Sequence, residues 1–198
     1  LPKTLQCSEF GEEVRFHFEP LAKADRVKLQ SWNVQKNETV SERQKAYLYF
    51  ANRMRKQDLA GQNRLLSELR AWAGLSPEAR ATHRALSREE LTRLSGNELF
   101  EIGAHSHNHV ALSGLSRENQ EKEIEKSKQV LESMIHKPVR SFSYPYGSAI
   151  DYSRESVSIV KRAGFNVACS NFPGMVFRTS DPFQLPRFLV RNWPGEIF

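Results

Sequence analysis

The stretch EIGAHSHNHVALSGL, residues 101–115, carries the most informative pattern in the chain. An apolar run ends at Gly103, and histidines then follow at alternate positions, His105, His107 and His109. His105 and His109 are four residues apart, so one helical turn or a tight loop can bring both rings to one face. Two neutral imidazoles placed in this way are a common partial ligand set for Zn²⁺ or a similar divalent ion. The spacing alone is equally compatible with a solvated histidine-rich loop, because a two-ligand motif is weak.

Composition favours a globular protein. The chain has 198 residues, of which 39% are hydrophobic and 26% charged, enough for one domain with its own core. No apolar run approaches the ~20 residues of a membrane span, and no signal-peptide pattern is present. The net charge is +6, but the basic residues are interleaved with acidic ones and no nucleic-acid motif accompanies them. We therefore expect neither a membrane span nor a nucleic-acid partner.

Residues 1–84 are predicted to form a strand-and-helix segment. In residues 13–19, Val14 and Phe16 alternate with polar residues, which is typical of a strand with one buried face. Ser41 and Gln44 form a plausible capping box at the start of a helix. The expected elements are a hairpin of strands 4–9 and 13–19, a strand at 27–34, and helices at 41–57, at 62–73 and from Ser76.

In residues 85–198 the predicted pattern is different, because strands and helices alternate. The expected strands are 98–103, 139–144, 165–169 and 187–190, and the expected helices begin after Ser87, Ser116 and Ser153. This order predicts parallel βα units, whose functional groups gather on loops after the carboxyl ends of the strands. The histidine stretch and the turn Pro145-Tyr146-Gly147 each follow such a strand, which favours metal binding over a solvated loop. For the turn alone, a proline-stiffened loop is the simpler interpretation.

Four segments in this order resemble the polysaccharide deacetylases with a NodB homology domain, carbohydrate esterase family 4: EIGAHSHNH, SFSYPYG, KRAGFNVACS and LPRFLVRNW. The resemblance covers residues 85–198, and residues 1–84 look like the insertion of a bacterial subgroup linked to exopolysaccharide biosynthesis. It implies an α/β fold, a partial, deformed (β/α)7 barrel with a helical insertion and an N-terminal β-hairpin. It also implies hydrolytic removal of N- or O-acetyl groups from a polysaccharide or oligosaccharide with one divalent metal, Zn²⁺ or alternatively Co²⁺ or Ni²⁺.

The resemblance assigns roles to individual residues. His105 and His109 match the two metal-binding histidines of the family's H-[ST]-x-x-H motif, whereas His107 falls on an unspecified position. Tyr146 matches the tyrosine of the R-x-P-Y motif, whose backbone N–H is expected to help hold the oxyanion during catalysis. The residues expected to bind substrate are Pro145, Gly147, Arg187 and Trp193.

The chain also departs from the family pattern. It has no adjacent pair of aspartates, whereas the family's Asp-Asp motif supplies one metal ligand and the general base. Ser143 stands where the R-x-P-Y motif has arginine, and Leu185-Pro186-Arg187 does not match the family's Leu-x-His motif. Asp151 is expected to serve the turn before the next helix rather than to replace the base. We therefore expect the C-terminal portion of a deacetylase, truncated upstream and inactive alone.

Other interpretations make different predictions. A non-catalytic sugar- or metal-binding module on a degenerate barrel would lack an upstream strand ending in Asp-Asp. A basic helical nucleic-acid binder, which the sequence disfavours, would lose polyanion affinity steeply with salt. An incomplete barrel should leave an open sheet edge through which the chain can associate. The compartment is left open, with the cell envelope or the extracytoplasmic space favoured over the cytoplasm.

Overall fold

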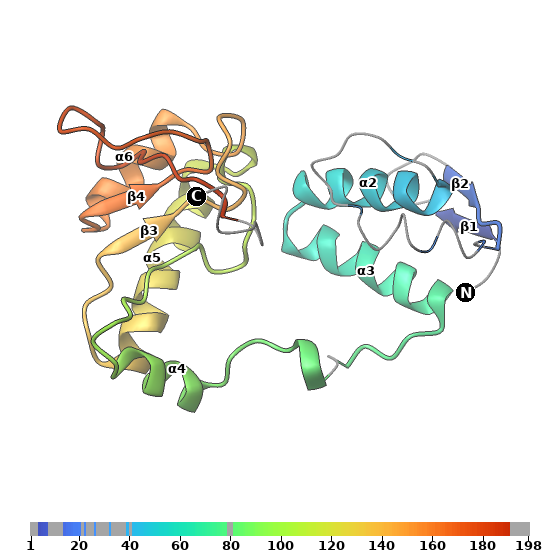
Figure 1. The fold of residues 1–198 in the computed structure, drawn as a ribbon, viewed down its shortest axis with the longest axis horizontal. Coiled ribbons are helices and arrows are strands. Elements are labelled where there is room, and N and C mark those ends of the chain that lie inside the picture. Colours follow the sequence, from blue (N-terminus) through green and yellow to red (C-terminus); the bar gives the residue numbers. More distant parts are fainter. Residues whose placement is uncertain are drawn as a thin grey trace, which may run out of the picture. The chain divides into compact units, whose positions relative to one another are not determined.

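The computed structural model describes residues 4–7, 14–20, 22, 26, 32, 39, 41–78 and 81–190. The chain divides into two compact units, Leu1–His83 and Arg84–Phe198, which are described separately below (Figure 1). Most of the strand expected at 27–34 lies outside the described residues, as does Trp193. Within the described part, no helix is both long and apolar enough to cross a membrane.

The first unit contains the predicted hairpin and two helices. Its elements are β1 (Thr4–Cys7), β2 (Val14–His17), α2 (Glu42–Arg55) and α3 (Leu59–Ala73). The strands pair antiparallel with Leu5 opposite Phe16, and both side chains are buried against Phe50 and Leu65 of the helices. The capping box predicted at Ser41 and Gln44 begins α2. In place of the helix expected from Ser76, the described residues form only a short 3-10 turn at Ala81–His83, because Leu75 is exposed and no apolar face is buried there.

The second unit is an α/β arrangement around parallel strands. Its elements are α4 (Arg88–Ser95), a 3-10 turn (Leu112–Gly114), α5 (Arg117–Ile135), β3 (Ser141–Ser143), α6 (Arg154–Arg162) and β4 (Val167–Cys169). β3 and β4 pair in parallel, with Phe142 opposite Ala168. Ala104 forms a parallel bridge to Phe142, and Leu185 forms one to Cys169. Four chain segments therefore run side by side in parallel, as the alternating pattern predicted.

The outer two segments are shorter than expected. Instead of strands at 98–103 and 187–190, the structure has single bridges at Ala104 and Leu185. Ala104 makes two backbone hydrogen bonds of 2.9 Å to β3, but its other side has no strand partner in the described part of the chain. Leu99, in the turn that follows α4, is 87% exposed. The described residues thus form an open sheet, and the closed form of a barrel is not present among them.

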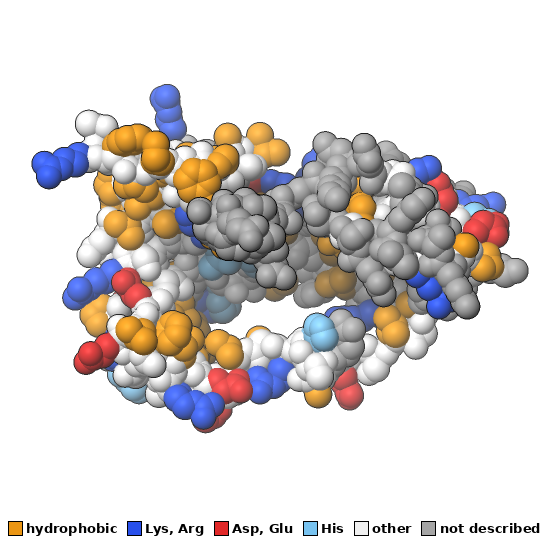
Figure 2. Space-filling model, viewed as in Figure 1, with side chains coloured by type: hydrophobic (Ala, Val, Ile, Leu, Met, Phe, Trp, Pro, Cys, Tyr) orange, Lys and Arg blue, Asp and Glu red, His pale blue; other side chains and the backbone are white. Residues whose placement is uncertain are grey.

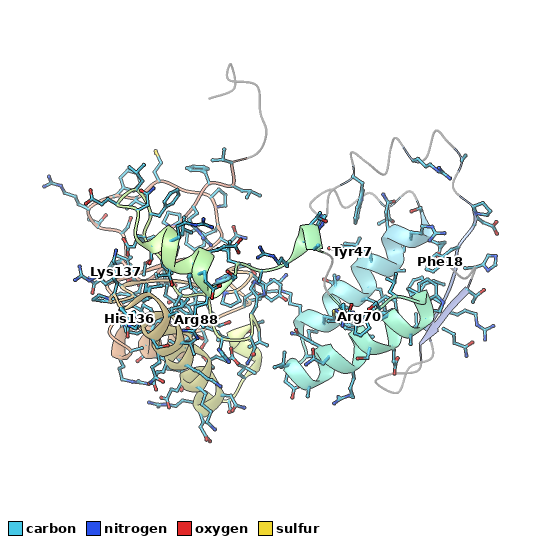
Figure 3. The ribbon with its side chains drawn as sticks, turned by 90° about the horizontal axis from the view of Figure 1, so that it is seen from below. Phe18, Tyr47, Arg70, Arg88, His136 and Lys137 are labelled. Carbon is cyan, nitrogen blue, oxygen red and sulfur yellow. The ribbon has the colours of Figure 1, made fainter. Side chains whose placement is uncertain are left out.

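The helices of this unit pack against the sheet around one buried core. Ile124, Val139, Val160 and Ala168 are fully buried in its core. α5 and α6 are also joined by a buried polar contact, in which the Ser156 hydroxyl donates to the Gln120 side chain over 2.7 Å. At the far end of α5, Lys137 donates to the last turn of α4, and Figure 3 shows His136 and Lys137 beside that helix.

Large apolar side chains also remain on the surface of the second unit (Figure 2). The most exposed in its last segment are Met175, Val176, Phe177, Phe188, Leu189 and Val190. Their exposure shows that the apolar runs there do not all belong to the core described above.

Candidate functional site

The histidine stretch is a tight loop that begins where the sheet ends. Ala104 is held in the sheet, and the chain then turns sharply, with left-handed backbone at Ser106 (φ 58°) and His109 (φ 56°). The Ser106 hydroxyl accepts a hydrogen bond from the His109 backbone N–H over 2.9 Å. This bond closes the loop and returns the chain so that His109 lies near His105.

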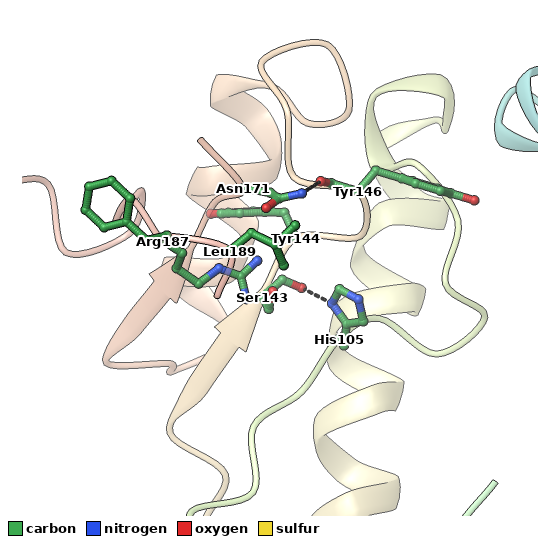
Figure 4. A pocket seen from close by; sticks show the side chains of 8 residues that line it. His105, Ser143, Tyr144, Tyr146, Asn171, Arg187 and Leu189 are labelled. Atoms are coloured by element: carbon green, nitrogen blue, oxygen red, sulfur yellow. Dashed lines mark hydrogen bonds between the residues drawn. The ribbon is translucent and has the colours of Figure 1, made fainter. Parts of the chain in front are cut away.

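The rings of His105 and His109 come together. Their centroids are 4.8 Å apart, and the His109 ring is 5.0 Å from the ring of Tyr146. His105 Nδ1 donates to the backbone oxygen of Ser143 on β3 over 2.7 Å, since a carbonyl oxygen can only accept (Figure 4). The Nε2 atom of His105 therefore carries the lone pair, which is the form that a metal ligand needs. These two histidines fit two positions of a divalent metal site.

The surroundings of His105 favour its neutral form. Partial burial lowers the pKa of His105, the hydrogen bond to the Ser143 carbonyl acts in the opposite direction, and the nearby His109 and Arg187 side chains lower it further. A neutral imidazole is the form that binds metal ions. The residues facing His105 thus favour the ligand form at neutral pH.

The turn after β3 forms the neighbouring wall. Tyr146 (φ 59°) and Gly147 (φ 71°) both have left-handed backbone, and the Gly147 N–H donates to the Pro145 oxygen over 2.6 Å. Asn171 follows β4 and fastens this turn. Its side-chain amide donates to the Tyr146 oxygen over 3.0 Å, and its backbone N–H donates to the Gly147 oxygen over 2.8 Å. The predicted residues Pro145, Tyr146 and Gly147 are therefore part of one fixed turn.

An open pocket of about 460 Å³ lies between these loops (Figure 4). Its described lining consists of His105, Ser143, Tyr144, Tyr146, Asn171, Arg187, Phe188 and Leu189. Arg187 is held by a hydrogen bond from Nε to the Ser170 oxygen over 2.6 Å. No carboxylate is among these lining residues, and the buried Ser143 hydroxyl has no hydrogen-bond partner in the described part of the chain. The described lining is therefore rich in nitrogen donors and contains no carboxylic acid.

Some candidate residues lie elsewhere. Among the described residues, no group of three His, Cys, Asp or Glu could hold a metal ion. The His107 side chain is exposed. Asp151 is buried, and its carboxylate accepts hydrogen bonds from the backbone N–H and the hydroxyl of Ser148, as expected for a turn residue.

The sequence reasoning missed the apolar and aromatic lining residues Tyr144, Phe188 and Leu189, and also two residues that hold the loops of the site, Asn171 and Glu123. Glu123 on α5 contacts the middle of the histidine loop, 16 and 15 residues away from His107 and Asn108. Asn171 contacts Tyr146 across 25 residues. Neither contact leaves a local pattern in the sequence. The position of Asn171 just after a strand could nevertheless have indicated that it belongs to the site.

This arrangement of parallel strands with a histidine pair and a tyrosine turn at their ends agrees with the comparisons to known proteins. The polysaccharide deacetylase family matches residues 38–168, and the chain belongs to this family. A protein of Bacillus subtilis (strain 168) that bears the name polysaccharide deacetylase YxkH is 27% identical over 110 residues, which are 56% of this chain and 37% of that protein. The chain thus spans little more than a third of that relative's length.

Solved structures show the same likeness. The Streptococcus pyogenes deacetylase PplD, determined in complex with acetate, matches with a TM-score of 0.50 and 19% identity over 54% of this chain and 46% of that one. BC0361, a polysaccharide deacetylase from Bacillus cereus, has a TM-score of 0.47 and 24% identity over 54% of this chain and 33% of that one. The likeness to PplD supports the α/β fold.

Proposed function

We propose that this chain is part of a metal-dependent hydrolase that removes acetyl groups from an acetylated polysaccharide. The observation that carries the proposal is the His105–His109 pair, with the free Nε2 of His105 set by Ser143, beside the Tyr146 turn. The family is that of the polysaccharide deacetylases, which are generally metal-dependent. The fold we propose for the whole enzyme is the family's deformed (β/α)7 barrel, of which this chain forms a part.

The proposed metal is Zn²⁺, with Co²⁺ or Ni²⁺ as alternatives, because imidazole nitrogen suits all three. His105 and His109 would hold it. When bound, such an ion polarises a carbonyl group and lowers the pKa of a water molecule. A third protein ligand would come from outside the described residues, since no third candidate gathers with the histidines among them.

The chain's own residues have separate roles in the proposal. The Tyr146 backbone N–H donates to the oxygen that becomes negative as the acetyl group is attacked. Asn171 keeps that N–H in place by holding the Tyr146 and Gly147 oxygens. Arg187, on the pocket wall, donates hydrogen bonds to the sugar, and Pro145, Gly147 and Trp193 complete the substrate site.

The general base is the missing part. The sequence has no adjacent aspartates, and the Asp151 carboxylate is occupied by Ser148. We infer that the base comes from outside these 198 residues. Positioned general-base catalysis contributes ~10²–10⁴-fold, so the chain alone should not deacetylate at a useful rate.

The test is acetate release from acetylated glucosamine oligomers, with Zn²⁺ or Co²⁺ added. We expect no turnover from the 198-residue chain, and turnover when it is joined to a family segment that carries the Asp-Asp motif. Loss of that turnover in His105→Ala and His109→Ala variants would support the assignment. Activity of the chain alone that disappears in Asp151→Asn would overturn the assignment of the base.

A non-catalytic binding module is the second candidate, favoured by the lack of a carboxylate among the pocket's described lining residues. It predicts binding of an acetylated oligosaccharide or a metal ion without turnover, even after the Asp-Asp segment is joined. The compartment stays open, with the cell envelope or the extracytoplasmic space favoured over the cytoplasm. The proposed partner is an acetylated polysaccharide or oligosaccharide, and no nucleic acid is expected. We expect association through the open edge of the sheet at Ala104.

A further inference from the structure

We propose that Glu123 on α5 is a positioning residue that sets the separation of the two histidines by holding the middle of their loop. This inference rests on the metal site proposed above and extends it to a residue on another element. One Glu123 carboxylate oxygen, Oε2, accepts hydrogen bonds from the backbone N–H groups of His107 and Asn108, over 3.0 and 2.8 Å. The other oxygen, Oε1, accepts from the Asn108 side-chain amide over 2.6 Å.

These contacts complete a loop that is otherwise held only at its ends. His105 is fixed by its bond to the Ser143 oxygen, and His109 by the bond from its N–H to Ser106. Between these ends, two successive backbone N–H groups point at one carboxylate oxygen, and hydrogen bonds to an ionised acceptor are the strong kind. Among the described residues, no other contact keeps both N–H groups on the side of α5. Without the Glu123 carboxylate, the two rings could therefore separate.

The loop needs such support because its backbone is unusual. Ser106 and His109 both have a left-handed φ, which residues with a side chain rarely adopt. Such conformations persist only where the surroundings over-determine them. Glu123 acts between these two residues, so it is placed to hold both of them in this conformation.

Glu123 is itself well anchored. The next residue, Ile124, is fully buried in the core of the second unit, and Gln120, one turn earlier, is bonded to Ser156 of α6. The helix is therefore a rigid support, and a site built on a rigid element is held more accurately than one supported by loops alone. The Glu123 carboxylate already accepts three N–H hydrogen bonds. It therefore supports the loop that carries the histidines from the side of α5.

The test compares Glu123→Ala with a matched control, Glu125→Ala, which makes the same change at an exposed position of the same helix. The first measurement is hydrogen exchange of the loop 104–110 without any metal. We expect at least tenfold faster exchange of the His107 and Asn108 N–H groups in Glu123→Ala and none of this acceleration in the control. The second is Zn²⁺ and Co²⁺ affinity by calorimetry, where loss of a supporting partner typically weakens binding by about 10–100-fold.

A conservative variant separates geometry from charge. In Glu123→Gln, the remaining side-chain oxygen can still accept from both backbone N–H groups, and the Asn108 amide can turn to pair with the new NH₂ group. We expect its metal affinity to lie between those of the wild type and Glu123→Ala. Should the alanine variant fail to fold, Asn108→Ala, which removes only the side-chain bond, supplies a milder test of the same loop.

The outcomes distinguish this inference from the proposed function. If the wild-type chain binds metal and Glu123→Ala binds and exchanges like the control, the positioning role is wrong while the metal site stands. If the wild-type chain binds no metal, the proposed metal site is wrong, and the exchange measurement still decides whether Glu123 holds the loop.

Discussion

Replacing Gly147 with alanine should destabilise the second unit more than the same change at Gly164. Both glycines have left-handed backbone, with φ of 71° and 76°. A methyl group at Gly147 would lie 2.9 Å from both the backbone nitrogen and the Cβ of Asn171, and 3.1 Å from the Tyr144 oxygen. At Gly164 the same methyl group would meet nothing within 4 Å. The two substitutions therefore share the conformational penalty and differ in the clash.

The expected magnitudes follow from these contacts. A side chain in the left-handed region costs about 1–2 kcal/mol, so Gly164→Ala should lower the free energy of unfolding by that amount. Gly147→Ala should lose about 1–3 kcal/mol more, because overpacking against backbone cannot be relieved by turning a side chain. The neighbouring Asn171 must also shift, which would loosen its bonds to Tyr146.

The assay is native-state hydrogen exchange in urea, followed on peptides from residues 139–169 so that only the second unit contributes. Equal losses of unfolding free energy in the two variants would refute the clash. A loss below about 1 kcal/mol for Gly147→Ala would also refute the left-handed turn itself.

Three further changes test the core, the site and the pH dependence. Ile124→Ala should lower the free energy of unfolding by about 2–5 kcal/mol, measured by urea denaturation, because the side chain is fully buried; a surface-like loss below 1 kcal/mol would contradict the packing. His105→Ala should abolish Co²⁺ binding, followed by its visible absorption, whereas His107→Ala should leave it unchanged. Hydrogen bonding from the Val139 N–H lowers the pKa of Glu132 from 4.5, and Lys128 adds to the shift. The ionised Glu132 side chain should therefore contribute its full stabilisation above pH 4.5 and lose it as the pH falls through the lower pKa of the folded state. Acid titrations should show a smaller loss in Glu132→Gln, and identical curves would rule this out.

Local patterns in the sequence predicted much of this fold. The alternation at Val14 and Phe16 predicted β2, and the serine caps at Ser41, Ser87 and Ser153 predicted the starts of three helices. These features depend on neighbours within a few residues, which is why a single sequence reveals them. Strands depend on partners distant in the sequence, and in place of the strands expected at 98–103 and 187–190 the described residues form single bridges at Ala104 and Leu185.

The candidate site divides in the same way. The spacing of His105 and His109 was visible in the sequence, and the structure brings their rings together. The bond from His105 to Ser143 spans 38 residues, so the tautomer of His105 was beyond sequence reasoning. The position of Trp193 lies outside the described residues and its role stays a prediction.

The backbone of the site is also held by contacts between distant parts of the chain. In the described part of the chain, four residues other than glycine have positive φ, and three of them, Ser106, His109 and Tyr146, are in the two loops of the site. Local preference alone would place glycine or asparagine there. Residues with side chains are tolerated at these positions because later parts of the chain hold the two loops. Glu123 of α5 holds one loop, and Asn171 in the segment after β4 holds the other. The geometry of the site is therefore a property of the folded second unit, and metal binding and folding of that unit should be thermodynamically linked.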